Sequence, residues 1–238
     1  MAVVLAAYWW YLSGHGAPRS TARARAELMR AQLVPLRIFA WSWIAGALAL
    51  VALAALWIVF VEVTGNGGNP TESQLNGYPT LFVVLGIAMG SLVSPITEET
   101  AFRGYAQVIL ERRFPAVAAV AISSAFFAAW HGPTQGFFWS KLLFFFLVGV
   151  VFGTIAYHTK SILPALPVHI AGDVLFFVVI WPQDAGRPVV WREGLGAGFW
   201  LVVLQLIVFG AAAVLAFRRL RAITSSQLPL AHSMPAAP

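Results

Sequence analysis

Apolar stretches alternate with short polar connectors along most of the chain. A helix needs about 20 mostly apolar residues to cross the hydrocarbon core of a membrane. Residues 38–63 and 199–217 meet this length, and Glu62 is the only charged residue in either stretch. Further apolar stretches cover residues 80–93 (with a helical pattern continuing to 113), 116–130, 142–157 and 162–180. The pattern predicts an all-α, polytopic transmembrane helical bundle with about six to seven spans.

The composition agrees with this prediction and excludes two other classes of protein. Hydrophobic residues make up 60% of the 238 residues and charged residues only 10%, and the mean hydropathy is +0.79. A soluble domain has about a quarter charged residues, so an ordinary soluble enzyme is excluded. Disordered chains are poor in aromatic residues, which are 14% here. Cysteine is absent, so no disulfide framework, thiolate metal site or catalytic thiol exists.

These stretches divide the chain into three regions. Residues 1–37 contain an apolar segment at 2–12, which is too short to span a membrane, followed by a basic connector with five arginines. Residues 38–217 form the membrane helical domain, with a core at about 80–180 that carries most of the ionisable residues within spans. Residues 218–238 form a basic tail that is rich in proline and alanine, and we expect this tail to be disordered.

Lysine and arginine fall mostly on one side of the predicted bundle. Eleven of them lie in the connector, in two later turns and after the last span, whereas three lie on the other side and Arg103 falls within a span. Short loops rich in Lys and Arg stay in the cytoplasm. We therefore expect a protein of the cell (inner) membrane with a cytoplasmic C-terminus. Basic loops that contact membrane lipids account for the net charge of +6, and we expect no nucleic-acid partner.

One pair of small residues predicts a close contact between helices. Gly149 and Gly153 are four residues apart within the stretch 142–157. Small residues at this spacing allow two membrane helices to approach closely. We expect another helix to pack against the face that carries both glycines.

Six ionisable residues lie within the predicted spans, where a charge is costly and functional residues are therefore expected. They are Glu98, Glu99, Arg103, His131, His169 and Asp173. At a rise of 1.5 Å per residue, Glu98 and His131 lie about 21 and 25 Å from the cytoplasmic turn between their helices. His169 and Asp173 lie roughly 14–20 Å from the turn at Lys160. Three helices thus bring polar groups to similar depths, which predicts that these groups meet around one pocket.

Helical periodicity assigns neighbours to these residues. Glu99 and Arg103 are spaced i,i+4 with the acid first, which is the better order for an ion pair. Glu98 is rotated by about 100° from Glu99, so we expect it to face a different neighbour. His169 and Asp173 are also spaced i,i+4 and share one helix face.

One carboxylate and two imidazoles, without a thiol or a serine-nucleophile motif, suit the activation of water. In one alternative Glu98 is the general base and His131 assists it. In the other, a divalent metal such as zinc activates the water, and its ligands are Glu98, His131, His169 and Asp173. His169 and Asp173 either bind this metal or stabilise the oxyanion of a tetrahedral intermediate. P-loops and the GxSxG and HExxH motifs are absent.

The same residues also have structural explanations. Pro95 fits the first turn of a helix, where nearby acidic residues are favoured. His131 precedes Gly132 and fits a helix end at the membrane interface. His169 and Asp173 fit a buried pair that holds two helices together.

Three motifs occur in order on separate predicted spans, and together they resemble those of a known family. The motifs are TEETAFRG at 97–104, FAAWH at 127–131 and HIAGD at 169–173. They resemble the EExxxR, FxxxH and HxxxN/D motifs of the CPBP intramembrane proteases, which include the type II CAAX-prenyl endopeptidases and bacteriocin-processing or self-immunity proteins. The resemblance implies an all-helical membrane fold and glutamate-dependent hydrolysis of a peptide bond.

The motif positions carry expected roles over to this chain. The resemblance implies that Glu98 and His131 activate the water, and that His169 and Asp173 line the oxyanion or metal side. The second acid and the arginine of TEETAFRG have a supporting role. The eukaryotic CAAX-processing members carry Asn where this chain has Asp173. An ionised Asp cannot donate a hydrogen bond to an oxyanion, which favours a metal-ligand or histidine-orienting role for Asp173.

We expect an intramembrane endopeptidase that opens toward the cytoplasm and cuts a peptide or protein substrate near a membrane face. Two other classes stay open. A non-catalytic membrane scaffold or bacteriocin self-immunity protein keeps the polar cluster for partner binding or helix packing. A transporter uses buried acids as a proton relay, but no internal repeat is detected, which disfavours this class.

Overall fold

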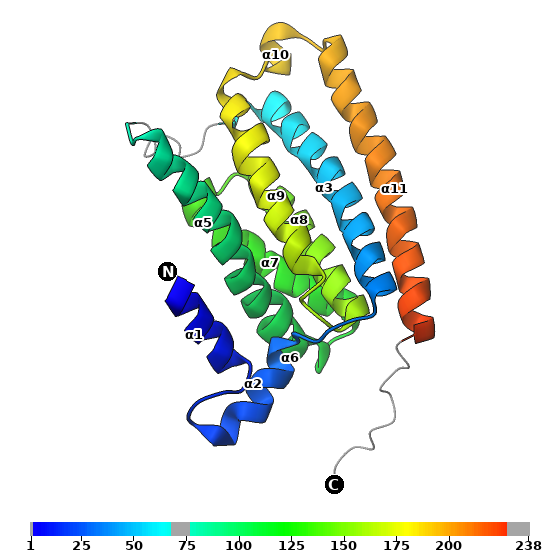
Figure 1. Ribbon diagram of the computed structural model, residues 1–238. Coiled ribbons are helices and arrows are strands. Elements are labelled where there is room, and N and C mark those ends of the chain that lie inside the picture. The colour runs from blue at the N-terminus through cyan, green and yellow to red at the C-terminus, as the bar shows by residue number, and fades with distance from the viewer. Residues whose placement is uncertain (1, 68–76, 228–238) are drawn as a thin grey trace.

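The computed structural model describes residues 2–67 and 77–227 and shows a bundle of long helices (Figure 1). Among these residues there is no strand, and six segments are long and apolar enough to cross a membrane. Four of them are single helices, namely α3 (Leu36–Thr64), α7 (Ala116–Gln135), α8 (Trp139–Thr159) and α11 (Ala197–Gln227). The segment Thr80–Glu111 consists of α5 (Thr80–Glu98), a π-helical segment (Glu99–Ala106) and α6 (Gln107–Glu111). The segment Ala165–Glu193 includes α9 (Ala165–Leu175), a π-helical segment (Phe176–Ile180), a 3₁₀ segment (Trp181–Gly186) and α10 (Val190–Glu193). The predicted all-α polytopic bundle is confirmed, with six spans, and the protein is an integral membrane protein.

Pro95 lies inside α5 and not in its first turn, so the explanation of Pro95 as a helix start is wrong. A proline inside a helix removes one backbone hydrogen bond and crowds the carbonyl four residues earlier. Directly after α5 the helix widens into the π-helical segment Glu99–Ala106. Single π-helical turns within α-helices are frequent at functional sites, and this one carries two of the six candidate residues.

His131 is an internal residue of α7, so the expected helix end at this position is wrong. The helix continues to Gln135, and the N–H of Gly136 donates to the carbonyl oxygen of Gly132 at 2.8 Å. Gly136 then takes a positive φ of 93°, which ends the helix. The extra turn places residues beyond His131 along the same wall of the bundle.

The last helix extends beyond the predicted span. α11 runs to Gln227, so the first ten residues of the expected tail continue the helix. Leu220 and Ile223 are buried and form a cluster with Ile38 of α3, which explains why the basic residues around them remain helical. Residues 228–238 lie outside the described part of the chain.

Close contact between α7 and α8 depends on small residues, as predicted for Gly149 and Gly153. A Cβ atom at Gly149 would lie 2.8 Å from Cβ of Ser124 in α7. A Cβ atom at Gly153 would lie 3.0 Å from Cγ1 of Val120. Real Cβ contacts are longer than this, so only glycine allows the two helices to approach to this distance.

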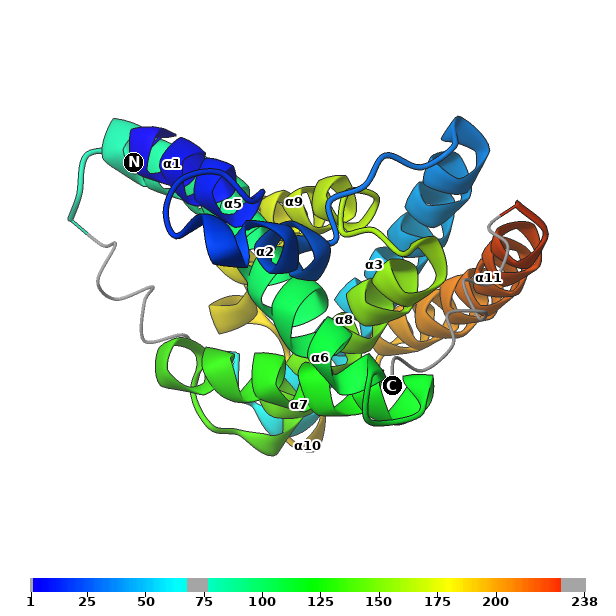
Figure 2. The same cartoon turned by 90° about the horizontal axis from the view of Figure 1, so that it is seen from below.

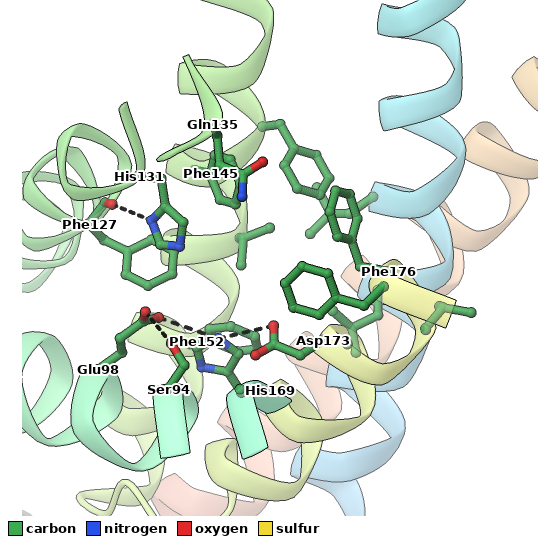
Figure 3. Close-up of a pocket in the computed structure, with 18 of the residues that line it drawn as sticks. Ser94, Glu98, Phe127, His131, Gln135, Phe145, Phe152, His169, Asp173 and Phe176 are labelled. Atoms are coloured by element: carbon green, nitrogen blue, oxygen red, sulfur yellow. Dashed lines mark hydrogen bonds and ion pairs between the residues drawn. The ribbon is translucent and has the colours of Figure 1, made fainter. Parts of the chain in front are cut away.

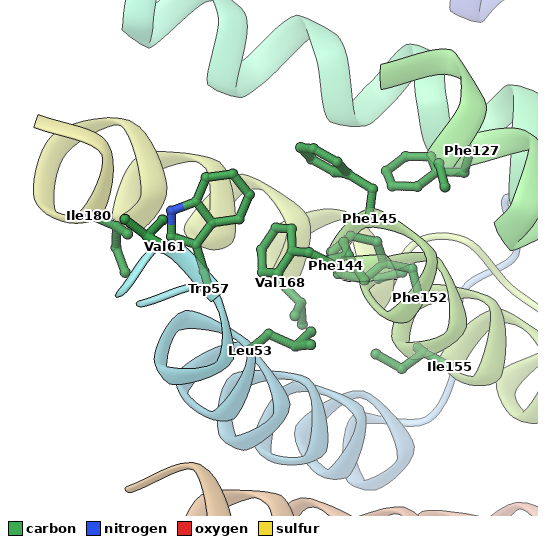
Figure 4. Packing of buried hydrophobic residues seen from close by; sticks show 13 residues of the cluster. Leu53, Trp57, Val61, Phe127, Phe144, Phe145, Phe152, Ile155, Val168 and Ile180 are labelled. Carbon is green, nitrogen blue, oxygen red and sulfur yellow. The ribbon is translucent and has the colours of Figure 1, made fainter. Parts of the chain in front are cut away.

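An aromatic core joins α3, α7, α8 and the α9 segment (Figure 4). The Trp57 ring packs edge-on against Phe144, with ring centroids 4.8 Å apart, and against Phe176 at 5.0 Å. Edge-to-face geometry at this distance is the favoured one for aromatic pairs. The rings of Phe145 and Phe152 extend this core toward the candidate site.

The N-terminal region folds against one end of the bundle. α1 (Ala2–Leu12) is too short to span, as predicted, and lies beside α5 (Figures 1 and 2). α2 (Ala22–Met29) follows, and its Arg25 is buried with Nη1 donating to the carbonyl oxygen of Tyr11 at 2.9 Å. The basic connector is therefore a folded element that packs on the helices.

Residues that the sequence assigns to one side of the membrane meet at this end. Arg30 forms a two-pronged ion pair with Glu111, in which Nη1 donates to Oε1 at 3.0 Å and Nη2 contacts Oε2. Nζ of Lys160 lies 3.6 Å from the same carboxylate. The backbone N–H of Ile162 donates to the carbonyl oxygen of Arg30 at 2.9 Å. We call this end, which carries α2, Glu111 and Lys160, the basic end.

Candidate functional site

A cavity of about 550 Å³ lies among α3, α5, α7, α8 and the α9 segment. Four of the six candidate residues line it, namely Glu98, His131, His169 and Asp173 (Figure 3). They come from three spans that are distant in sequence, and their side chains point into the same space. The prediction that these groups meet around one pocket is confirmed for these four residues, whereas Glu99 and Arg103 do not line the cavity.

Glu98 faces the cavity from the last turn of α5. Its Oε1 accepts a hydrogen bond from Oγ of Ser94, one turn earlier, at 2.6 Å. Its Oε2 lies 3.7 Å from Nε2 of His169. The serine fixes one carboxylate oxygen, and the other faces the neighbouring helix and the cavity.

His131 faces the same space from α7. Its Nδ1 lies 2.8 Å from the carbonyl oxygen of Phe127, one turn earlier. A carbonyl only accepts hydrogen bonds, so Nδ1 carries the proton in this contact, and Nε2 of the neutral ring is an acceptor. The ring stacks on Phe145 with centroids 4.1 Å apart, which fixes its plane.

His169 connects the cavity with the packed interior. Its Nδ1 lies 2.9 Å from Oε1 of Glu99, and its ring stacks on Phe152 with centroids 4.3 Å apart. Its Nε2 lies 3.7 Å from a carboxylate oxygen of both Glu98 and Asp173. The contact with Asp173 confirms that these two residues share a helix face.

Glu99 and Arg103 lie behind the cavity wall. Their side chains are 0% and 1% exposed, and Nη1 of Arg103 lies 3.2 Å from Oε1 of Glu99. The predicted ion pair is therefore present, and Glu98 has a different neighbour, as predicted. The Arg103 guanidinium also lies 4.1 Å from the centre of the Phe127 ring, a cation–π geometry that favours a buried charge.

Several contacts of the site are absent from the sequence predictions. The pair of Ser94 and Glu98 has i,i+4 spacing, which is the signal for such a contact. The contact of Glu99 with His169 joins residues that are 70 positions apart, and no local spacing signals it. Phe127 supplies both a carbonyl for His131 and a ring for Arg103.

The donor groups do not fit a resident metal ion in this arrangement. Among the described residues, no group of three or more His, Cys, Asp or Glu side chains is placed to hold a metal. The Nδ1 atoms of His131 and His169 are engaged with Phe127 and Glu99, which leaves only Nε2 of each ring as a possible ligand atom. The prediction of zinc at Glu98, His131, His169 and Asp173 stays untested, and the chemistry below is derived from side chains alone.

Comparison with known proteins gives one match. Residues 79–175 match the family model described as type II CAAX prenyl endopeptidase Rce1-like. No curated protein and no solved structure matches the chain. The matched region contains α5, α7, α8 and α9, with all four residues that line the cavity. It also contains the three motifs on which the resemblance to the CPBP proteases rests, so residues 79–175 form a domain of the Rce1-like family of type II CAAX prenyl endopeptidases.

Proposed function

We propose that the protein is an intramembrane endopeptidase in which Glu98 is the general base. The observation that carries this proposal is a carboxylate within a membrane span, 11% exposed, that faces a cavity together with two histidines from other spans. Ionisable groups within membrane spans are costly and are kept for function. The match to an endopeptidase family over the same residues supports the proposal.

Glu98 and His131 are placed to activate water. We assign the proton of the attacking water to the Glu98 carboxylate. The free Nε2 of His131 accepts a hydrogen bond from the other O–H of that water and orients it, because Nδ1 is already engaged with Phe127. The water oxygen then adds to the carbonyl carbon of the scissile peptide bond. A positioned base of this kind contributes about 10²–10⁴-fold to the rate.

His169 is placed to stabilise the charge that develops on the carbonyl oxygen. In its imidazolium form, Nδ1–H donates to Glu99 and Nε2–H is directed at the cavity. A donor preorganised in this way lowers the energy of the tetrahedral intermediate. Collapse of the intermediate breaks the C–N bond, and Glu98 returns its proton to the leaving amine. The products are a carboxylic acid and an amine.

Asp173 is assigned a positioning role in this scheme. Its Oδ1 lies 3.7 Å from Nε2 of His169, and its side chain is 23% exposed. An ionised Asp accepts and cannot donate hydrogen bonds, so it does not bind the oxyanion itself. It attracts the imidazolium of His169 and holds the ring toward the cavity.

We assign the basic end to the cytoplasmic side of the cell membrane. The residues that form it carry most of the lysine and arginine outside the spans, and such loops stay in the cytoplasm. The C-terminal end of α11 lies at the same end of the bundle (Figure 1), which supports the proposal of a cytoplasmic C-terminus.

The test compares two glutamates from different spans in the purified full-length protein. The probe is a quenched-fluorescent peptide that ends in a farnesylated CAAX sequence, together with the same peptide without the farnesyl group. We expect Glu98→Gln to lower kcat/KM at least 1000-fold, because Gln keeps the shape and cannot accept the proton. Glu62→Gln is the matched control, since Glu62 is buried in α3 and does not line the cavity. It should retain activity.

His131→Ala provides the second measurement, with an expected loss of about 100-fold or more. Full activity in either Glu98→Gln or His131→Ala, with an unchanged elution profile in detergent, would overturn the mechanism. If the wild-type protein cleaves neither peptide and Glu98→Gln keeps its biological effect, the non-catalytic scaffold or immunity function is favoured. A chelator titration in the same assay checks the zinc prediction.

A further inference from the structure

The path from the cavity to the basic end is closed by packed layers. Below Glu98, the same helix carries buried side chains at steps of four residues: Glu99, Arg103 and Gln107, all 0–1% exposed. Nε2 of Gln107 donates to Oε1 of Glu111 and to the carbonyl oxygen of Gly153, both at 2.9 Å. None of these side chains lines the cavity.

The connector covers this stack from outside. A Cβ atom at Gly104 would lie 3.0 and 3.1 Å from the carbonyl oxygens of Leu28 and Met29, so the end of α2 lies directly on the π-helical segment. The side chain of Met29 is 1% exposed, and Ile162 is fully buried. A substrate from the basic end would have to displace these layers, so residues 2–67 and 77–227 show no opening of the cavity at the basic end, where an opening was expected.

The exposed part of the cavity wall lies in the other half of the bundle. Gly90 of α5 and Trp130 of α7 both line the cavity, Trp130 is 67% exposed, and a Cβ atom at Gly90 would have no neighbour within 4 Å. Gly90 is eight residues before Glu98, which places it about 12 Å farther from the basic end. Thr134 also lines the cavity and is exposed, one residue before the end of α7. These residues form a mouth between α5 and α7.

The lining indicates what this mouth admits. Aromatic and aliphatic side chains make up most of the wall, including Phe144, Phe176 and Phe177, and no Lys or Arg lines the cavity in the described part of the chain. The ionisable lining groups are two acids and two histidines. A carboxylate on the bound segment would therefore meet Glu98 and Asp173, and the one cationic lining group of the proposed mechanism, the His169 imidazolium, is already paired with Glu99, so binding a carboxylate costs energy.

We propose that the substrate enters between α5 and α7 in the half of the membrane away from the basic end, as a peptide segment of apolar, uncharged residues. The identity of the occupant, a peptide substrate, rests on the proposed peptidase function. The route itself rests on two observations: the buried side chains of Glu99, Arg103 and Gln107 close the basic end, and the mouth between α5 and α7 is exposed. With the basic end in the cytoplasm, cleavage takes place on segments that reach the opposite side of the membrane.

The route is tested without any need for catalysis. Because the chain contains no cysteine, Ser94→Cys is a unique reporter thiol inside the cavity. Its rate of modification by a small water-soluble methanethiosulfonate is measured in the full-length protein in detergent. We expect Thr134→Trp, at the mouth, to slow this rate at least fivefold. Arg113→Trp, an exposed position at the basic end, is the matched control and should change the rate less than twofold.

A second variant at the mouth provides an independent measurement if Thr134→Trp does not fold. Gly90→Trp enters the same opening from α5, where open space surrounds the glycine, and should also slow the reaction. Equal rates in all three variants, or slowing by Arg113→Trp alone, would overturn the route.

Peptide cleavage separates this proposal from the proposed function. We expect Thr134→Trp to lower kcat/KM at least tenfold, and two Asp residues in the peptide beside the cleaved bond to lower it by a similar factor. Slower thiol modification in a protein that cleaves no peptide would leave the route intact and refute the function. Glutamate-dependent cleavage that Thr134→Trp does not affect would refute the route and leave the function intact.

Discussion

Glu98 and Glu99 are adjacent in sequence but belong to two different layers of the molecule. Glu99 lies in a packed layer with Arg103 and Nδ1 of His169, and its side chain is fully buried. Glu98 lies in an open layer that faces the cavity, where Ser94 is its one hydrogen-bond donor among the described residues. His169 belongs to both layers, with one nitrogen on each side.

The difference shows how a membrane protein keeps reactive groups in place. The packed layer holds the His169 ring by an ion pair and by stacking on Phe152. The open layer leaves carboxylate and imidazole atoms available to water and substrate. Preorganisation of this kind requires a rigid support behind the reacting groups, so variants in the two layers should have different effects.

The largest effect on stability is expected in the packed layer. Glu99→Ala leaves the Arg103 guanidinium buried without its carboxylate, and loss of one partner of a buried ion pair costs about 3–5 kcal/mol. We expect a large drop in the midpoint of thermal unfolding in detergent, measured by tryptophan fluorescence. Activity should fall as well, because His169 loses the contact that orients it.

The double variant Glu99→Ala with Arg103→Met is the control for this prediction. Replacing a buried ion pair by apolar residues is often neutral or stabilising, so the double variant should recover most of the stability lost by Glu99→Ala. It should not recover activity, since His169 still lacks its partner. A double variant that is no more stable than Glu99→Ala would contradict the account of the packed layer.

The open layer was easier to predict from sequence than the packed one. Charge within an apolar stretch marks Glu98, His131 and His169 directly, and helical spacing predicts the pairs of Glu99 with Arg103 and of His169 with Asp173. These signals depend only on local periodicity and on the cost of burying charge. The six spans and the glycine contact of α8 follow from equally local patterns.

The remaining features depend on contacts between distant segments. The Glu99–His169 contact and the seal of α2 over Gly104 each join residues from separate elements, and no spacing in the sequence encodes them. The helical interior position of His131 contradicts the local signal of Gly132 and Pro133, because the core between α7 and α8 continues past that point. Tertiary packing therefore explains why the local signal at His131 predicted the wrong helix end.

The seal at the basic end gives a prediction of intermediate size. Gly104→Ala forces the end of α2 away from the π-helical segment, since the new Cβ would lie 3.0 Å from the Leu28 carbonyl oxygen. Overpacking of this kind costs about 1–3 kcal/mol. We expect a lower midpoint of thermal unfolding and faster proteolysis of the connector in detergent.

Gly90→Ala is the matched control on the same span. Its Cβ enters open space, and replacing a helical glycine by alanine gains about 0.5–1 kcal/mol. The two substitutions are chemically identical, so opposite signs of their effect on the midpoint would report the packing difference between the basic end and the mouth. Equal destabilisation by both would mean that α2 does not rest on Gly104 as described.

The smallest effect is expected from Ser94, which acts on the open layer alone. Ser94→Ala removes the hydrogen bond to Oε1 of Glu98, and a hydrogen bond to a charged group contributes about 1.5 kcal/mol or more, so kcat/KM should fall about tenfold or more with little change in stability. Thr97→Val is the matched control, because the Thr97 hydroxyl donates to backbone carbonyl oxygens and not to Glu98. An equal loss in both variants would show that the turn, and not the Ser94 contact, sets the position of Glu98. A loss confined to Ser94→Ala would show that the open layer is also held by its own hydrogen bond.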